Sequence, residues 1–313
     1  MPASAVVLLN RAAAGGRAAA LAEPMRAWLA AHAPGVPLFE ADSIQRSRAT
    51  LQCLPARSRV VVVGGDGSVH QMLPVLLTHR HTLAVVPLGS GNDTARALGV
   101  RSLAWPQALA LGLAGTPRRI DTGELRVDGR RVPFISSLAA GFDAAVAQRA
   151  LDAPRWLQGR PRYVWATLRE LAALRRWSVR LALDGAPERP ANVLFASTLN
   201  TPTYGAGMPA VPAASIDDGR LDLLLAGRFG RLAVLHMLPL LMAGRHLGHP
   251  QVETRGFELL RIESQPALPL AADGEPLPAA HSFEVRVRAA SLSVVSAVPP
   301  RLGPSNHSDR PSP

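Results

Sequence analysis

Two glycine-rich loops, each carrying an aspartate, hold the residues of this chain best suited to chemistry. The first is Val-Val-Val-Gly-Gly-Asp-Gly-Ser over 61–68, and the second is Val-Val-Pro-Leu-Gly-Ser-Gly-Asn-Asp-Thr-Ala-Arg over 85–96. Glycine lets backbone N–H groups approach a phosphate closely. An aspartate beside them would repel that phosphate unless a cation lay between the two. The pair of loops therefore indicates a site for a metal-bound nucleotide phosphate.

The segments around these loops predict a parallel α/β sheet over residues 1–120, because short apolar runs alternate with helical patterns. In open α/β sheets, ligands bind beyond the carboxyl ends of the strands. Asn10 and both glycine loops lie at such ends, so we expect them to converge on one edge. The expected strands are Ala5–Leu9, Val60–Val63 and Leu83–Val86, and the expected helices are Arg17–Ala33, Ser68–Leu77, Asn92–Leu98 and Pro106–Ala114.

After Ile120 the pattern changes to short β-like runs separated by turn signals, which predicts an antiparallel sandwich or barrel. Two helices are expected within it, Tyr163–Trp177 and Arg231–Met242. The predicted domains are thus 1–120 and 121–298, followed by a disordered tail over 299–313. The expected strands of the second domain are Glu124–Val127, Phe134–Leu138, Ser178–Leu183, Val193–Ser197, Leu221–Leu225, Phe257–Glu263, Phe283–Val287 and Ser291–Val298.

Composition excludes several kinds of site and of partner. All 34 basic residues are arginine, so a P-loop lysine, a kinase strand lysine and a Schiff-base lysine are excluded. The net charge of +11 favours an anionic membrane surface. Nucleic acid is not expected as a partner, because the arginines are scattered and follow no recognised binding motif.

The remaining composition predicts a soluble cytoplasmic protein. A single cysteine, Cys53, fits a reducing compartment and rules out a disulfide framework. No apolar run reaches the ~20 residues that a membrane-spanning helix needs. The first ten residues lack the basic region of a signal peptide and are interpreted as a buried strand.

The two loops and their downstream partners resemble the diacylglycerol kinase catalytic-domain family, which includes YegS-like lipid kinases and sphingosine kinases. The resemblance spans roughly residues 5–298 and rests on an ordered series of motifs. After the two loops these are Ile120-Asp121-Thr122-Gly123, Ala140-Gly141-Phe142-Asp143, Tyr204-Gly205-Ala206-Gly207-Met208, Asp217-Asp218-Gly219-Arg220-Leu221-Asp222 and Asp273-Gly274-Glu275-Pro276-Leu277. The family implies an N-terminal α/β nucleotide domain resembling phosphofructokinase and NAD kinase, and a C-terminal antiparallel β-sandwich. It also implies that ATP and Mg²⁺ meet in the cleft between them.

The resemblance implies roles for individual residues. Asp66 and Asp93 would hold Mg²⁺ near the β- and γ-phosphates, with a helix cap as the alternative for Asp93. Glu275 would be the general base that accepts the proton of the attacking hydroxyl, whereas an ordinary Asp-Gly hairpin is the alternative. Arg96 could reach phosphate or be a solvated helix arginine. The residues implied to contact the nucleotide are Asn10, Ser43, Gly64, Gly65, Asp66, Gly67, Ser68, His70, Gln71, Gly89, Ser90, Gly91 and Asn92.

Two features qualify this assignment. The family usually has an Asn-Glu pair where this chain has His70-Gln71, and Gln71 carries no charge. Ser215, Asp218 and Arg220 match a structural Mg²⁺ site of some bacterial members, with a plain turn as the alternative.

The sequence therefore predicts an ATP-dependent lipid kinase that associates peripherally with an anionic membrane. A kinase of a soluble substrate, or a non-catalytic nucleotide- or lipid-binding protein, is the alternative. The acceptor lipid stays open, and so does the oligomeric state, a homodimer included.

Overall fold

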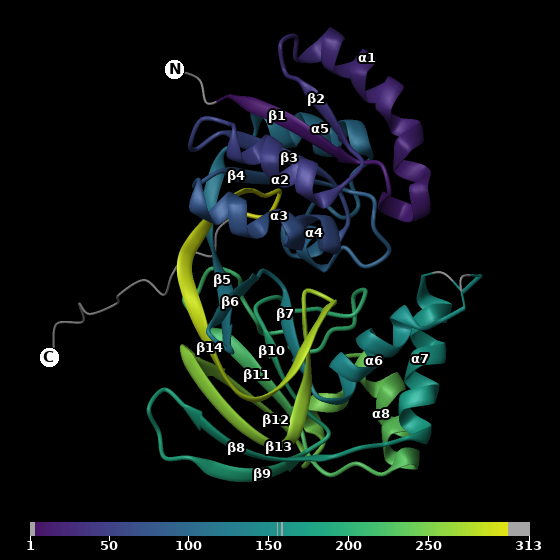
Figure 1. The fold of residues 1–313 in the computed structure, drawn as a ribbon, viewed down its shortest axis with the longest axis vertical. Coiled ribbons are helices and arrows are strands. Elements are labelled where there is room, and N and C mark those ends of the chain that lie inside the picture. Colours follow the sequence, from purple (N-terminus) through teal and green to yellow (C-terminus); the bar gives the residue numbers. More distant parts are fainter. Residues whose placement is uncertain (1–3, 155, 158, 300–313) are drawn as a thin grey trace, which may run out of the picture.

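The computed structural model describes residues 4–154, 156–157 and 159–299. The chain forms two successive parts, first an α/β sheet and then an antiparallel sandwich (Figure 1). The disordered tail expected from residue 299 lies, from residue 300 onward, outside the described residues.

The first sheet is parallel and has the strand order β2-β1-β3-β4. Its central strands are buried on both faces, which explains their uninterrupted valine and leucine runs. The three predicted strands are confirmed. The four-residue β2 was missed, since it is short and carries no apolar run. The bounds are β1 (Ala5–Asn10), β2 (Leu38–Ala41), β3 (Arg59–Gly64) and β4 (Thr82–Pro87).

Helices cover both faces of this sheet, as expected for an α/β unit. The helix expected over Arg17–Ala33 is divided, because 3₁₀ turns extend to Leu21 and the regular helix begins only at Ala22. A helix over Ile44–Gln52 was missed. The helices are η1 (Ala13–Leu21), α1 (Ala22–His32), α2 (Ile44–Gln52), α3 (Asp66–Thr78), α4 (Asp93–Ala97) and α5 (Trp105–Ala114).

The second half is an antiparallel β structure with three helices packed beside it, as Figure 1 shows. Its core is one large apolar cluster built from residues 125–285. The strands are β5 (Pro117–Val127), β6 (Arg130–Phe134), β7 (Ser137–Ala140), β8 (Trp177–Leu183), β9 (Arg189–Val193), β10 (Phe195–Leu199), β11 (Leu221–Ala226), β12 (Val252–Phe257), β13 (Leu259–Ala272) and β14 (Glu275–Val295). The helices are α6 (Phe142–Leu151), α7 (Arg160–Ala172), α8 (Arg231–Met242) and η2 (His246–Gly248).

The helices of this half confirm one expectation and correct two. α8 has the expected bounds. The helix expected over Tyr163–Trp177 ends at Ala172, because Trp177 begins β8, where its buried indole donates to the Ala267 carbonyl at 3.2 Å. Helix α6 was not expected, since its start coincides with the Gly141-Phe142-Asp143 motif.

Asp128-Gly129 and Asp273-Gly274 each form the two-residue loop of a hairpin, and Asp184-Gly185 forms the first turn of the longer loop between β8 and β9. All three Asp-Gly pairs have positive φ at both positions. This pattern is typical of the type I′ turn that suits the right-handed twist of a hairpin. The third turn joins β13 to β14 and fixes the register in which Glu275 begins β14.

Strand β14 connects the two halves of the molecule. The two strands expected over Phe283–Val287 and Ser291–Val298 are one strand, with a bulge that preserves its pairing to β5. At its end Ser293 and Val294 pair in parallel with β4 of the first sheet. The domain boundary at residue 120 stays a prediction, but β14 pairs with strands on both sides of that boundary and ties the β half to the α/β half.

Candidate active site

The two glycine loops lie in direct backbone contact at the carboxyl edge of the first sheet. The Leu88 N–H donates to the Gly64 carbonyl at 2.9 Å. A Cβ placed on Gly65 would lie 2.9 Å from the Gly89 Cα, closer than real Cβ contacts permit. These glycines are therefore required by the approach of one loop to the other. They leave a surface of backbone N–H groups at the start of α3, suited to phosphate.

We expect the Gly89→Ala variant to bind ATP about tenfold or more weakly. Its Cβ would lie 2.7 Å from the Gly65 Cα and 2.7 Å from the Asn92 Oδ1, so the loops must separate. Isothermal titration with ATP measures the loss. Gly248→Ala is the control, because a Cβ there meets nothing within 4 Å. Unchanged affinity in Gly89→Ala would contradict the proposed contact.

Asp66 links the first loop to the second. It is the first residue of α3, and its carboxylate accepts the N–H of Asp93 at 3.0 Å and of Thr94 at 3.1 Å. Asp66 therefore caps the N-terminus of α4, a role that the sequence had suggested for Asp93. Burial raises the pKa of Asp66, the charge of Asp93 adds to this, and the two N–H donors oppose it.

Asp93 links the second loop to the β half. Its carboxylate accepts the Thr203 hydroxyl at 2.8 Å, the Ala206 N–H at 3.0 Å and the Arg96 guanidinium at 2.9 Å. Ala206 lies in the Tyr204–Met208 motif, whose ends pair as a tight loop. Arg96 is thus part of this cluster and not a freely solvated arginine. Thr203 was missed, although it directly precedes the Tyr204–Met208 motif.

Glu275 reaches the first glycine loop from the other end of the chain. It is the first residue of β14, half-buried, directly after the Asp273-Gly274 turn. A Cβ placed on Gly67 would lie 2.5 Å from the Glu275 Oε1. The proposed base and the proposed phosphate loop, distant in sequence, are therefore brought together.

His70 joins the nucleotide half to the turn that carries Glu275. Its Nδ1 lies 3.0 Å from the Asp273 Oδ2. The other oxygen of Asp273 accepts the backbone N–H groups of Ser136 and Ser137 and the Ser136 hydroxyl. Asp273 was interpreted only as a turn residue, so its role was missed. His70 thus helps to hold the turn that carries Glu275.

The same pair has opposed pKa shifts. Burial alone would lower the pKa of His70, but the Asp273 carboxylate, and more weakly Glu275, raise it. Burial alone would raise the pKa of Asp273, but His70 and the backbone donors lower it. Both shifts favour the ion pair.

We expect His70→Asn to lower stability by about 1 kcal/mol at about pH 6, and by less at about pH 8. A raised histidine pKa stabilises the fold fully below its ordinary value of 6.5, and this contribution is lost as pH rises through the folded pKa. The lowered carboxyl pKa contributes above 3.8 and is lost as pH falls below it. Urea unfolding across this range measures the difference, with the exposed His236→Asn as control. A difference independent of pH would contradict the ion pair.

The other expected nucleotide contacts divide into two groups. Asn10 donates to the Ser68 hydroxyl at 2.8 Å, and a Cβ on Gly91 would meet the Asp66 carboxylate, so these residues share the cluster. Asn92 bonds the Gly89 backbone through both ends of its amide. Ser90 lies between Gly89 and Gly91 in the same loop.

The Ser43 and Gln71 side chains make contacts with helix α2. The Ser43 hydroxyl caps α2 by accepting the Arg46 N–H at 3.2 Å. The Gln71 Oε1 accepts Arg48 at 3.1 Å, which ties α2 to α3. Their roles toward a nucleotide stay predictions, while these helix contacts account for both side chains.

Ser215, Asp218 and Arg220 form a hydrogen-bonded turn. The Ser215 hydroxyl donates to Asp217 at 2.7 Å, and the Asp218 carboxylate accepts the Arg220 N–H at 3.0 Å. Among the described residues, no group of three or more His, Cys, Asp or Glu has a metal-holding arrangement. A cation here would depend on backbone carbonyls, so this site stays a prediction.

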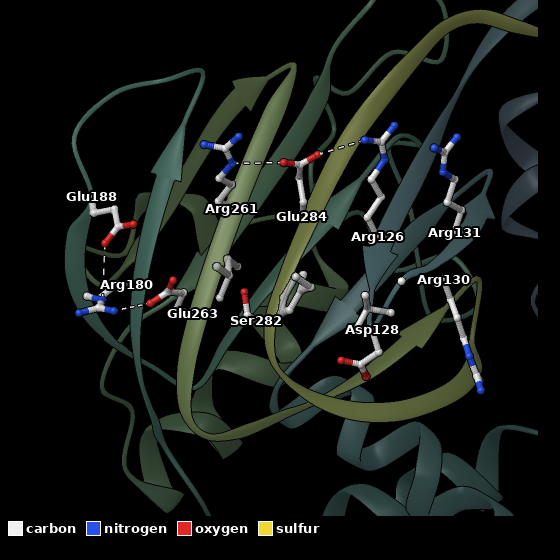
Figure 2. A pocket seen from close by; sticks show the side chains of 14 residues that line it. Arg126, Asp128, Arg130, Arg131, Arg180, Glu188, Arg261, Glu263, Ser282 and Glu284 are labelled. Atoms are coloured by element: carbon white, nitrogen blue, oxygen red, sulfur yellow. Dashed lines mark hydrogen bonds and ion pairs between the residues drawn. The ribbon is translucent and has the colours of Figure 1, made fainter.

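A groove of about 500 Å³ on the open face of the β half is separate from this cluster (Figure 2). Its arginines alternate with carboxylates, as where Glu284 lies between Arg261 at 3.2 Å and Arg126 at 3.8 Å. Such exposed cross-strand pairs contribute little each. The groove is therefore interpreted as a sheet surface with nearly balanced charge and not as the active site.

Comparison with known proteins identifies the family. Residues 4–125 match the diacylglycerol kinase catalytic domain, and residues 136–296 match the YegS C-terminal NAD kinase beta sandwich-like domain. The chain belongs to the diacylglycerol kinase family. It is 35% identical over 240 residues to a diacylglycerol kinase of Mycobacterium tuberculosis. The aligned region covers 75% of this chain and 76% of that protein.

Solved structures confirm the fold of this family member. A diacylglycerol kinase from Bacillus anthracis superposes with a TM-score of 0.66 at 16% identity, covering 94% of this chain and 96% of the other. An NAD kinase from Archaeoglobus fulgidus, solved with ATP, superposes with a TM-score of 0.53 at 11% identity, covering 93% of each chain. The predicted combination of an NAD-kinase-like α/β domain with an antiparallel sandwich is therefore confirmed. The enzyme is a kinase, as expected from the motifs. In the part of the chain that the structure describes, no helix has the length and apolarity required to traverse a bilayer.

Proposed function

We propose that this kinase transfers the γ-phosphoryl group of Mg-ATP to a hydroxyl group of a lipid. The observation that carries the proposal is the contact of Glu275 with Gly67, which sets a carboxylate against a phosphate-binding loop. Phosphoryl transfer to an alcohol depends on a carboxylate within reach of the attacking hydroxyl and on groups that bind the triphosphate. The Glu275 carboxylate and the first glycine loop, which lie together, are suited to meet these two requirements.

The triphosphate would bind through backbone N–H groups of the two glycine loops and the start of α3. No lysine is present in the chain, so backbone and arginine must supply the remaining positive potential. Arg96 lies beside the second loop, where its guanidinium pairs with Asp93 and donates to the Gly91 carbonyl.

Asp66 and Asp93 are suited to hold Mg²⁺. Carboxylate oxygens are its preferred protein ligands, and each oxygen of Asp66 accepts a single N–H, which leaves a lone pair available. The raised pKa of Asp66 indicates that the protein does not fully compensate its charge. When bound with ATP, Mg²⁺ offsets the negative charge of the β- and γ-phosphates.

In the reaction, the lipid oxygen forms a bond to the γ-phosphorus, and the bond between the γ-phosphorus and the β–γ bridging oxygen breaks. ADP leaves with that electron pair, and the hydroxyl proton passes to the Glu275 carboxylate. The His70–Asp273 pair holds the turn from which Glu275 projects. We interpret His70 and Asp273 as positioning residues.

A phosphate-transfer panel tests the proposal. Purified protein receives γ-labelled Mg-ATP with mixed micelles of diacylglycerol, phosphatidylglycerol or a sphingoid base, or with glycerol in solution. We expect label in the organic extract for at least one lipid. Label only in a water-soluble ester would favour a kinase of a soluble substrate. ATP binding without transfer to any acceptor would favour a non-catalytic binding protein.

A further inference from the structure

Helix α8 exposes an apolar stripe to solvent. Leu232, Leu235 and Met242 are 82%, 43% and 66% exposed, and their spacing places them on one side of the helix. Val234 is the residue of α8 that is buried. A helix that is apolar all round is normally covered, so this stripe calls for a partner.

The neighbouring helix α7 repeats this feature. Val164 and Leu168, one turn apart, are 58% and 55% exposed, and Trp156 just before the helix is 80% exposed. The Arg231 guanidinium at the start of α8 donates to the Ala172 carbonyl at the end of α7, at 2.9 Å. Figure 1 shows α6, α7 and α8 together beside the sandwich. We define Trp156, Val164, Leu168, Leu232, Leu235 and Met242 as the apolar helix face.

The charges around this face are mostly positive. Residues 223–252 contain Arg228, Arg231 and Arg245 but no aspartate or glutamate. Between residues 153 and 183 the one carboxylate is Glu170, which is buried and bonded to Arg149 at 2.7 Å. The exposed Asp152, just before this stretch, lies 3.9 Å from Arg149. An anionic surface would therefore be attracted to the face, since each nearby arginine adds to the attraction.

We propose that the apolar helix face docks on an anionic phospholipid bilayer, with its leucines in the interfacial region and the arginines at the headgroups. The functional reason for this docking rests on the proposed function, in which the acceptor is a lipid. A second copy of the chain fits less well, because a self-complementary contact would bring arginine-rich surfaces together without carboxylates to pair them.

Docking here would bring the bilayer close to the proposed active site. Helix α6 packs against α7 and also against β14, the strand that begins at Glu275. The apolar helix face and the proposed base are therefore carried by neighbouring elements of the β half.

Vesicle sedimentation without nucleotide tests the docking. Vesicles of phosphatidylcholine alone are compared with vesicles that also contain phosphatidylglycerol. We expect the protein to prefer the anionic vesicles, with binding that weakens as salt rises. The double variants Leu232→Asp/Leu235→Asp and Val164→Asp/Leu168→Asp should each reduce the partition coefficient about tenfold or more.

Phe39→Asp is the matched control, because Phe39 is 41% exposed, like Leu235, but lies on β2 of the nucleotide half. It should bind vesicles as the native chain does. The α7 and α8 variants should also retain phosphate transfer to a short-chain diacylglycerol dispersed as monomers. Retained vesicle binding in both double variants would overturn the proposal. The proposal would also be overturned if light scattering showed that the native chain and Phe39→Asp are dimers and that the double variants are monomers. Vesicle binding without any lipid phosphorylation would overturn the proposed function and leave the docking intact.

Discussion

Glu275→Gln is expected to lower kcat for phosphate transfer about 10²–10⁴-fold while leaving the affinity for ATP unchanged. The amide keeps the size of the side chain and its place against Gly67 but cannot accept the hydroxyl proton. A loss confined to kcat would separate a catalytic group from one that only shapes the loop. Initial rates at saturating ATP, together with titration of ATP binding, measure both quantities.

Glu258→Gln is the matched control for this variant. Glu258 is an exposed glutamate in the same antiparallel half, between β12 and β13. Its substitution should leave kcat unchanged. Full activity in Glu275→Gln would contradict the assignment of the base.

Asp66→Asn is expected to lower both activity and stability. One of the two oxygens that accept the N–H groups of Asp93 and Thr94 becomes an amide donor, so a buried N–H loses its partner. An unsatisfied buried donor costs about 1–3 kcal/mol. The displaced second loop, and the lost charge opposite the phosphates, should lower kcat about 10²–10³-fold. Thermal unfolding and initial rates measure the two effects.

Asp152→Asn serves as the control for Asp66, because that carboxylate is 64% exposed. It should match the native chain in both measurements. If Asp66→Asn were stable but inactive, the role of Asp66 would be limited to binding phosphate or metal. If the variant were active but unstable, its role would be limited to capping α4. We expect neither, because the carboxylate bridges the two loops.

The sequence predicted the parts of the fold that depend on local patterns. Valine runs placed β1, β3 and β4, and the Asp273-Gly274 pair placed the hairpin turn before Glu275. It missed β2, since four residues give too short a period to recognise. It also divided β14 in two, because a bulge interrupts the apolar pattern but not the hydrogen bonding to β5.

The sequence predicted which residues belong to the candidate site but not the contacts that those residues make with one another. The motifs identified Asp66, Asp93 and Glu275, and the fold brings their loops together. The contact of His70 with Asp273 spans 203 residues, and no local pattern in the sequence could indicate it. The capping of α4 by Asp66 was missed for the same reason. The change from Asn-Glu to His70-Gln71, which had counted against activity, provides a hydrogen bond to the turn that carries the proposed base.

The fate of the γ-phosphoryl group tests the central claim most directly. The native chain and Glu275→Gln are incubated with γ-labelled Mg-ATP and anionic vesicles that contain diacylglycerol, and bound ATP and organic-phase label are counted in each sample. The account expects both proteins to bind ATP and only the native chain to move label into the lipid extract. Equal label in the lipid from both proteins, or bound ATP with no lipid label from either, would contradict it.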